Sequence, residues 1–454
     1  MGDLSRRAFL GRSTAAVGGL AVAGVGAACS GSGSGSGSGG DDAGGAPADQ
    51  AAAEPSPFDP GDWASVRDQF PLTTDVAQFA AFVLAAHPRP VAEAIEGHRA
   101  GLDDHTHAYL ASTELEAEEA VHAAAAEYLG AQPGEVALTH STTMGLGLLY
   151  GGLRLRPDQH VLTTEHDFYS THQALNLRVA REGVTVDRVR LYDDPAVATA
   201  GDVVDRLMAG VTPATRVVAV TWVHSVSGVK LPVRAIADAL ATANAGRAPD
   251  DRALLCVDGV HGLGVEDVTV TELGCDFLVA GTHKWLFGPR GTGIVWGRAD
   301  AWSAVEGVIP AFEPGSFGEW RNGGPPGPMS SVRFSPGGYH GFEHRWALAE
   351  AFRFHLDIGK DRVAARTYEQ ATQLKQGLAE LDGVTLVTPP GEEMSSGIVC
   401  FDLDDTPPAD ALGRLFSAGI DASITPYNDQ HVRVGPGITT TPDEVDRLLD
   451  ALAD

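Results

Sequence analysis

Two reactive side chains of opposite type follow two apolar runs near the middle of the sequence. Asp258 ends the run ALLCVD, and Lys284 comes after the run DFLVAG, directly beside His283 and before a Gly-rich turn. The chain has four lysines, at positions 230, 284, 360 and 375. An amine and a carboxylate placed alike, each just after a buried-looking run, indicate a chemical site rather than two unrelated surface charges. A histidine, His261, lies close to Asp258 in the sequence.

Short apolar runs alternate with helical patterns along much of the chain. The runs are typical of buried strands, and the alternation predicts an α/β fold with a mostly parallel sheet covered on both faces. The predicted strands are 135–140, 160–164, 185–191, 217–223, 253–258, 276–281 and 293–297. Polar residues follow several of them, at the carboxyl ends where sites in such sheets gather. These are Thr139 to Thr143, Glu165-His166, His224, Asp258 and His283-Lys284.

The remaining pattern predicts how the domains are divided. We expect an N-terminal segment over residues 58–85, a large domain over 86–315 and a smaller α/β domain over 316–454. Thr113 and Glu116 fit a capping box, which predicts that a helix begins there. A Gly/Pro-rich passage covers 310–341, and one long helical region is predicted from Glu343 to Leu381.

Composition excludes several classes of function. The net charge of −28 argues against binding nucleic acid or anionic membrane surfaces. The cysteines at 29, 256, 275 and 400 lack CxxC spacing, so we expect neither a metal site nor a disulfide framework. The last three lie in apolar runs and are predicted to be buried small hydrophobic residues.

The first residues differ in composition from the rest. Residues 1–29, with Arg6-Arg7 before an apolar stretch, resemble a twin-arginine export signal, and Gly26-Ala27-Ala28-Cys29 is similar to a lipoprotein cleavage site. Residues 30–57 are rich in Gly, Ser, Ala and Pro, which predicts a flexible tether. We expect export to the cell envelope or beyond, and the tether directly after Cys29 favours a lipid anchor at that residue. A cleaved soluble signal and an artificial linker are the alternatives.

From about residue 77 to the end, the chain resembles the class V aminotransferase family of pyridoxal phosphate (PLP) enzymes. The resemblance rests on D-G-x-H at 258–261, T-H-K-W at 282–285 and G-P-x-G-x-G at 288–293. Within the family, the chain is most similar to the isopenicillin N epimerase-like branch. The resemblance implies the PLP-dependent transferase fold type I, with PLP as cofactor.

The matched positions imply which residues would bind the reactive part of PLP. Lys284 matches the Schiff-base lysine, whose amine must be neutral and therefore needs a lowered pKa. Asp258 matches the acid that keeps the pyridine nitrogen protonated, so that the ring can accept electrons. His261 matches the position that bonds the ring hydroxyl group.

The resemblance also implies contacts to the ring. His166 matches the residue stacked on the ring face, and Tyr169 competes for that role. His224 matches a strand end near the cofactor, where Ser225 or Ser227 would assist.

The phosphate end is assigned in the same way. The segment Ser141-Thr142-Thr143 opens a helix, whose first N–H groups and dipole favour a phosphate. His283 matches a further phosphate contact. Relatives often carry Ser where this chain has Gly281, and Thr282 is the candidate to replace it.

The substrate side is less well matched. Arg433 matches the arginine that binds the substrate carboxylate group through its fork of donors. Relatives often have Ser at the position of Gly435. Tyr339 and His340 are candidates to line the substrate pocket. The resemblance implies a homodimer, but the loop SPGGYHGFEHRW lacks the Gly-Thr pair that usually reaches the other subunit's phosphate.

Several functions remain open at this point. The first is a PLP enzyme that acts on an amino-acid-type substrate through Lys284, as an aminotransferase or epimerase. A C–S lyase or cysteine desulfurase is the alternative, although the single cysteine between Pro389 and Arg433 is Cys400, inside a predicted strand. An exported, non-catalytic binding relative is a third hypothesis, which the intact set of Asp258, His261 and Lys284 disfavours.

Overall fold

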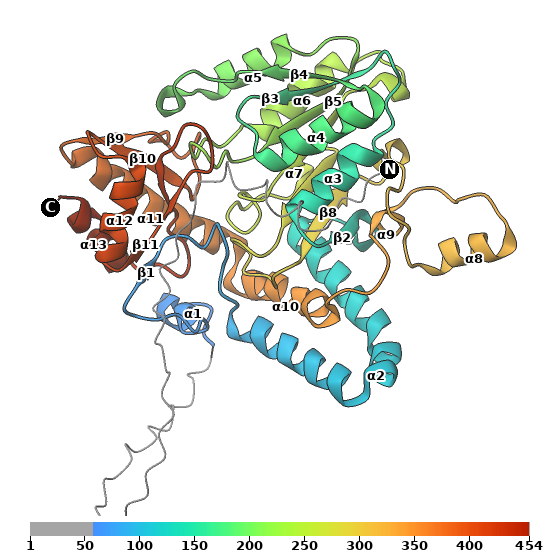
Figure 1. Cartoon of the computed structure of the whole chain (residues 1–454), viewed down its shortest axis with the longest axis horizontal. Coiled ribbons are helices and arrows are strands. Elements are labelled where there is room, and N and C mark those ends of the chain that lie inside the picture. The colour runs from blue at the N-terminus through green and yellow to red at the C-terminus, as the bar shows by residue number, and fades with distance from the viewer. Residues whose placement is uncertain (1–57, 454) are drawn as a thin grey trace, which may run out of the picture. The chain divides into compact units, whose positions relative to one another are not determined.

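A seven-stranded sheet forms the centre of the protein. The computed structural model describes residues 58–453, so the predicted export signal and tether lie outside the described residues. The strands lie in the order β2-β8-β7-β6-β5-β3-β4 (Figure 1). Their bounds are β2 (Val136–Thr139), β3 (His160–Thr164), β4 (Thr185–Val189), β5 (Thr215–Thr221), β6 (Leu254–Asp258), β7 (Phe277–Gly281) and β8 (Gly293–Gly297).

The direction of the strands agrees with the predicted α/β fold. Strand β3 is parallel to β4 and β5, and β6 is parallel to β5 and β7. Strand β8 is antiparallel to both of its neighbours, β2 and β7. The connection from β7 to β8, residues 282–292, contains no helix, whereas a parallel pair usually needs a helical crossover. The predicted mostly parallel sheet is confirmed.

Side chains of the strands alternate between two cores, one on each face of the sheet. Val217 and Ala219 of β5 belong to one buried cluster, whereas Val218 and Val220 belong to the other. Such alternation follows from the two-residue period of a strand. Apolar residues at every position are therefore what a sheet buried on both faces requires.

Helices supply the other side of each core. On one face, α3 (Thr142–Gly152) and α4 (Tyr169–Glu182) contribute to the buried cluster. On the other face, the buried cluster draws on five helices. They are α2 (Arg89–Leu129), α5 (Ala200–Ala209), α6 (Val233–Ala243), α7 (Val270–Leu273) and α10 (Phe342–Ile358).

The long helix α2 corrects one prediction. Thr113 and Glu116 lie inside α2, so no helix begins there. The break falls instead at His105, where the backbone leaves the helical region with φ −145° and ψ 60°. The residues from Ala108 to Glu119 are mostly good helix formers, and the local capping pattern cannot outweigh that continuous preference together with packing on α10.

A second, smaller sheet forms the core of the C-terminal part. Its strand order is β12-β13-β10-β9, and all of its pairs are antiparallel. The strands are β9 (Val384–Leu386), β10 (Val399–Leu403), β12 (Ser423–Ile424) and β13 (Val432–Val434). Helices α11 (Lys360–Glu380), α12 (Pro408–Ser417) and α13 (Pro442–Ala453) pack with it (Figure 1). Strand β9 was not predicted, because its short, partly exposed sequence carries little hydrophobic signal.

The beginning of the described chain packs against this smaller sheet region. Strand β1 (Ala77–Gln78) pairs in parallel with β11 (Ile420–Asp421), and Ala77 and Phe79 are fully buried in the same core. The short helix α1 (Trp63–Arg67) precedes it, and Arg67 forms an ion pair with Glu444. The N-terminal segment is thus held by residues from the other end of the chain.

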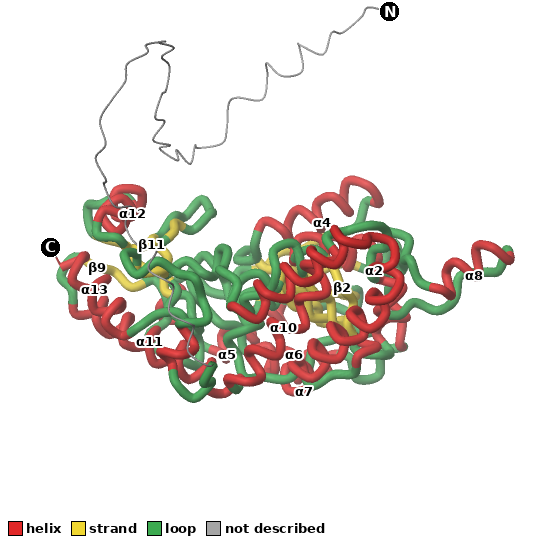
Figure 2. The backbone as a smooth tube through the Cα atoms, turned by 90° about the horizontal axis from the view of Figure 1, so that it is seen from below, coloured by secondary structure: helices red, strands yellow, loops and turns green. Residues whose placement is uncertain are grey.

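Two further features lie between the sheets in sequence. The long helical region predicted over 343–381 is present as two helices, because Gly359, with φ 96°, separates α10 from α11. The Gly/Pro-rich passage contains α8 (Pro314–Asn322) and α9 (Ser331–Phe334). Helix α8 buries none of its residues and stands away from the central sheet (Figure 2). No helix within residues 58–453 is long and apolar enough to cross a membrane.

Candidate active site

The predicted site residues follow strands that end at the same edge of the central sheet. Asp258 is the last residue of β6, Lys284 follows β7, and His224 follows β5. His166 follows β3, and Ser141 follows β2. Because these strands run in the same direction, their carboxyl ends bring all five residues to one region.

A buried cavity of about 170 Å³ lies at this edge. It brings together Asp258, His261, Lys284 and Arg433, although Arg433 comes from the smaller sheet. Apolar side chains complete the wall, including those of Phe82, Val83 and Phe168. The N-terminal segment therefore contributes to a site whose reactive groups lie far along the chain.

Asp258 and Lys284 modify each other's ionisation. Burial raises the pKa of the Asp258 carboxyl group, and the nearby Lys284 charge opposes this rise. Burial lowers the pKa of the Lys284 amine, and the charge of Arg433 lowers it further, whereas Asp258 acts in the opposite direction. The amine is thereby moved toward its neutral, nucleophilic form.

His261 is held between two partners. The indole Nε1–H of Trp285 donates to Nδ1 of His261 at 3.2 Å, so Nδ1 carries no proton. Its Nε2 atom lies 3.4 Å from the Lys284 amine. Burial keeps the pKa of His261 well below its usual value, so the ring is neutral and the proton is on Nε2. His261 thus presents a donor beside the lysine.

The start of α3 lies beside the segment that follows β7 and carries Lys284. The Ser141 hydroxyl group caps the helix by accepting from Met144 N at 3.1 Å. Thr142 Oγ1 accepts from Gly281 N at 2.7 Å. The first N–H groups of a helix have no acceptor within it, so α3 offers an anion site at its end. A Cβ atom added to Gly281 would lie 3.0 Å from both Thr142 Oγ1 and His283 Cε1, which explains why this position has no side chain.

Three other predicted phosphate contacts differ in their surroundings. The Thr143 hydroxyl group is 2.9 Å from that of Ser170. The Thr282 hydroxyl group is instead 2.5 Å from that of Thr292, in a separate buried pair. His283 keeps its Nδ1 atom buried without a hydrogen-bond partner among the described residues. The structure therefore leaves Nδ1 of His283 available to a further group, whereas Thr282 is engaged elsewhere.

His166 and His224 lie next to each other, with ring centroids 5.5 Å apart. Burial lowers the pKa of each to about 3, so both are neutral. Tyr169, the competing candidate for the ring-stacking role, is exposed at the start of α4. Tyr192 contacts both histidines and was missed by sequence reasoning, since it belongs to no motif.

Arg433 is fixed in place from several sides. Its Nε donates to Ser423 Oγ at 3.1 Å, its Nη1 donates to Ser225 O at 3.2 Å, and its guanidinium lies 4.7 Å from the ring centre of Phe82. The rest of the fork faces the cavity that Lys284 also lines. Tyr427, a second residue missed by sequence reasoning, bonds the Ser225 hydroxyl group at 2.9 Å and packs beside Arg433.

Tyr339 is the predicted substrate contact that lies apart from this set. It is 84% exposed, and its ring packs on Phe342. His340 lines a separate cavity of about 210 Å³ together with His140, His344 and Arg345. In this chain neither residue reaches the cavity around Lys284.

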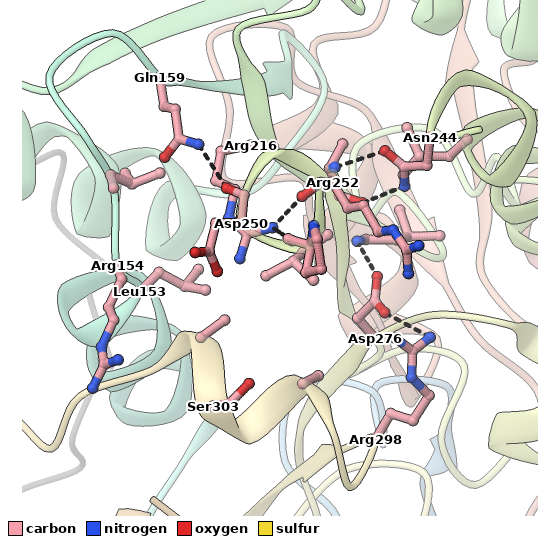
Figure 3. A pocket seen from close by; sticks show the side chains of 18 of the residues that line it. Leu153, Arg154, Gln159, Arg216, Asn244, Asp250, Arg252, Asp276, Arg298 and Ser303 are labelled. Carbon is pink, nitrogen blue, oxygen red and sulfur yellow. Dashed lines mark hydrogen bonds and ion pairs between the residues drawn. The ribbon is translucent and has the colours of Figure 1, made fainter. Parts of the chain in front are cut away.

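A wider hollow of about 1110 Å³ lies at the opposite edge of the sheet, and Figure 3 shows side chains that line it. Residues that precede β3, β6 and β7 line it, together with Arg216 of β5. Some of its charged side chains already have partners: Arg298 pairs with Asp276 at 2.9 Å, and Arg216 donates to the backbone carbonyl of Pro249 at 3.3 Å. This hollow is wide, but it lacks the unpaired buried groups that mark the smaller cavity.

A family comparison identifies the kind of site. The sequence profile of the "Aminotransferase class-V" family matches residues 87–448.

The chain belongs to the class V aminotransferase family.

Known relatives of this class V enzyme have different activities. The chain is 26% identical over 407 residues to an isopenicillin N epimerase of Streptomyces clavuligerus, covering 86% of this chain and 98% of the relative. It is 25% identical over 394 residues to a cysteine desulfurase of Haloferax volcanii, covering 80% and 86%. The match to the family is therefore broad, while the activities of the relatives diverge.

Solved structures confirm the predicted fold type I. A complex between the cystine C-S lyase C-DES and its product cysteine persulfide aligns with a TM-score of 0.74 at 20% identity, over 85% of this chain and 99% of that chain. A cysteine desulfurase of Thermococcus onnurineus NA1 aligns with a TM-score of 0.72 at 22% identity, over 86% and 97%.

The class V enzymes are PLP-dependent, and the buried groups of this site fit that cofactor. Within residues 58–453, Thr221 Oγ1, His224 Nε2 and His283 Nδ1 are buried without a hydrogen-bond partner. A buried polar atom without a partner is costly, and PLP carries a ring hydroxyl, a ring nitrogen and a phosphate that can satisfy such atoms. No cluster of His, Cys, Asp and Glu in the described chain is arranged to hold a metal ion.

Proposed function

We propose that this enzyme uses PLP to transform an amino-acid-type substrate at its α-carbon, as an aminotransferase or an epimerase does. The observation that carries the proposal is that the carboxyl group of Asp258 and the amine of Lys284 line the same cavity as Arg433. The other lysines are engaged elsewhere. Lys230 bonds Tyr368, Lys360 donates to two backbone carbonyl groups, and Lys375 bonds Ser395. Lys284 is then the amine that carries the chemistry.

Asp258 has the role of an electrostatic partner. PLP, when bound, withdraws electrons from the α-carbon of the substrate, most strongly when its ring nitrogen is protonated. Burial raises the pKa of the Asp258 carboxyl group more than the Lys284 charge lowers it, and a protonated ring nitrogen would supply a further positive partner. Asp258 therefore holds the proton of that nitrogen in place.

Lys284 has two roles in this proposal. Its amine would hold the cofactor, and as a neutral amine it would take the α-proton of the substrate as a general base. The lowered pKa of Lys284 suits both roles, because an amine must be neutral to accept a proton. His261, with its proton on Nε2, orients the amine from a distance of 3.4 Å.

Arg433 orients the substrate. Its guanidinium is held by Ser423, by the Ser225 carbonyl group and by the face of Phe82, so the free part of its fork has little freedom. A preorganised fork matches a carboxylate group. An amino acid bound in this way has its α-carbon directed toward Lys284.

The alternative is a C–S lyase or a cysteine desulfurase, which are the activities of several relatives. Desulfuration through a protein thiolate requires a reactive cysteine. Cys400 is fully buried in β10, and burial raises the pKa of its thiol to about 12. Cys256 and Cys275 are buried too. Among the described cysteines there is no candidate nucleophile, which favours the first proposal and restricts the alternative to lyase chemistry without a protein thiol.

We further propose a homodimer and export by the twin-arginine route, on the basis of family resemblance and of residues 1–29 respectively. Light scattering of the purified protein tests the proposed homodimer. A monomer at micromolar concentration would contradict it.

The experiment that tests the function begins with purified protein and added PLP. We expect a visible absorption band, and borohydride should fix the cofactor onto a peptide that contains Lys284. The Lys284→Ala variant should lose this attachment, whereas Lys360→Arg should keep it. A colourless wild type that cannot be reconstituted would refute PLP chemistry.

Reaction type is then read from products. D- and L-amino acids with 2-oxo acid acceptors are followed in D₂O for α-proton exchange, inversion, transfer of the amino group and release of sulfide. Exchange with inversion or transfer supports the proposal. Sulfide release from cysteine or cystine without either would support the lyase alternative.

A further inference from the structure

Tyr192 joins two of the predicted cofactor contacts. It lies just beyond strand β4 and is 6% exposed. Its hydroxyl oxygen is 2.8 Å from Nδ1 of His224 and 3.0 Å from Oγ of Ser227. Its ring lies parallel to that of His166, with centroids 3.9 Å apart and an angle of 15° between the planes. A single side chain thus contacts both histidines.

The hydrogen bond to Tyr192 determines how His224 is oriented. His224 is completely buried, and its Nε2 atom has no hydrogen-bond partner within the described chain. The two ring nitrogens of an imidazole point in widely different directions, so a bond that holds Nδ1 turns Nε2 away from Tyr192. Because a buried polar atom needs a partner, Nε2 is available to a group that the protein itself does not supply.

Two consecutive residues, Leu191 and Tyr192, hold His166 on two sides. The backbone N–H of Leu191 donates to Nε2 of His166 at 3.2 Å, so this nitrogen carries no proton. The ring of the next residue, Tyr192, covers one face of the imidazole. The opposite face of the same ring is the one that a stacked cofactor would use. Residues 191 and 192 therefore orient His166 together.

We propose that Tyr192 is a positioning residue for PLP. Its hydroxyl group donates to Nδ1 of His224, which leaves the Nε2–H of that histidine as a donor to the cofactor, and its ring supports His166 from the side away from the cofactor. The inference rests on the proposed placement of both histidines at PLP. Ser227 donates to the Tyr192 oxygen, which completes a chain of hydrogen bonds from Ser227 through Tyr192 to His224.

The direction of this chain follows from the ionisation of its members. Burial lowers the pKa of His224 to about 3, so the ring is neutral and bears one proton. Burial raises the pKa of Tyr192 far above its usual value, so the phenol keeps its proton and can donate it. A neutral histidine that accepts at Nδ1 must carry its proton on Nε2.

Two substitutions separate the functions of the hydroxyl group and the ring. Tyr192→Phe removes the hydrogen bond and keeps the stacking on His166, and Tyr192→Leu removes both. Tyr128→Phe is the matched control, because it removes a buried phenol hydroxyl group from helix α2, outside the site. Thermal unfolding of the cofactor-free proteins shows whether each variant is folded.

The first readout needs no cofactor. In protein with ¹⁵N-labelled histidine, the His224 signals, assigned with His224→Gln, should show the Nε2–H tautomer in wild type and in Tyr128→Phe. Tyr192→Phe should give a mixture of tautomers. If wild-type His224 carries its proton on Nδ1, or if Tyr192→Phe leaves the tautomer unchanged, the proposed direction of the chain is wrong.

The second readout is the dissociation constant of PLP. We expect it to rise about tenfold in Tyr192→Phe, as for the loss of one buried hydrogen bond, and further in Tyr192→Leu, with no change in Tyr128→Phe. Equal affinity in wild type and Tyr192→Phe would overturn the inference while leaving the proposed function intact. Failure of the wild type to bind PLP would refute the proposed function itself. If Tyr192→Phe and Tyr192→Leu lose PLP affinity equally, the ring of Tyr192 does not support His166.

Discussion

The hydroxyl group of Thr142 accepts a hydrogen bond from the backbone N–H of Gly281, with 2.7 Å between oxygen and nitrogen. This bond joins the first residue of α3, where an anion can bind, to the last residue of β7, which leads to Lys284. The two ends of the candidate cofactor site are thereby held at a fixed separation. The same bond also satisfies a buried amide that would otherwise lack a partner.

Thr142→Val should weaken both stability and cofactor binding. The variant keeps the shape of the side chain but leaves the Gly281 N–H unpaired, which costs about 1–3 kcal/mol. We expect a lower melting temperature and about a tenfold higher dissociation constant for PLP. Thr242→Val, on the exposed face of α6, is the control and should match the wild type in both. Unchanged PLP affinity in Thr142→Val would show that this hydroxyl group does not position the phosphate end.

Arg433→Lys should impair substrate binding more than cofactor binding. Lysine keeps the charge but loses the fork and the contact with the face of Phe82, so a carboxylate group is held by fewer directed hydrogen bonds. The KM for amino acids should rise about 10- to 100-fold, the range expected for a charged hydrogen bond. The affinity for PLP should change little. Steady-state kinetics and cofactor titration test this, and an equal loss in both would assign Arg433 a structural role instead.

Acidification should destabilise the protein through buried histidines. His355 is completely buried in α10, and burial lowers its pKa to about 3, whereas the unfolded chain has the ordinary value of 6.5. A histidine with a lowered folded pKa stabilises the fold above pH 6.5 and loses that contribution as the pH falls toward the folded value. From pH 7 to pH 5, this single group should remove about 2 kcal/mol from the free energy of unfolding.

The variant His355→Leu tests this assignment. Its free energy of unfolding, measured by denaturant titration of the cofactor-free protein, should fall less steeply between pH 7 and pH 5 than that of the wild type. The difference between the two proteins in that pH change is the quantity to compare. Identical slopes would mean that His355 is not protonated on unfolding in this range.

Cys29→Ser tests the proposed lipid anchor in cells. If Cys29 is lipidated, the variant should move from the membrane fraction to the soluble fraction outside the cytoplasmic membrane. Replacement of Arg6 and Arg7 by Lys should retain the protein in the cytoplasm if export follows the twin-arginine route. Cys275→Ser, a buried position, is the control for loss of a thiol. Unchanged fractionation of Cys29→Ser would contradict the anchor.

Much of the fold was predictable because local and global preferences agree. The strands of the central sheet are continuous apolar runs, since both faces are buried, and such runs need no knowledge of their neighbours. The carboxyl ends of β6 and β7 could be located in the same way, which is why Asp258 and Lys284 were predicted together. The apolar pattern did not reveal the break at His105 or the one at Gly359, because tertiary packing and a left-handed glycine determine those positions.

The rest of the site depends on contacts between distant segments. Tyr192 and Tyr427 belong to no local motif, and their importance appears when β4 and the smaller sheet are placed beside the histidines and Arg433. Tyr339 shows a second limit of sequence matching. Its position before the long helix was matched to a family loop, yet in this chain its side chain packs on Phe342 at the surface. Sequence spacing alone did not indicate which way the Tyr339 side chain points.

The pairing of β1 with β11 has a consequence for biosynthesis. A ribosome releases Ala77 well before its partner, Ile420, which emerges only after the central sheet and helices α10 to α12 have been made. Until then Phe79 has no core to enter, and the wall that Phe82 contributes to the cavity has no smaller sheet to rest on. The site is therefore completed only after β11 and β13 have been made, so a nascent chain that lacks them cannot have a finished active site.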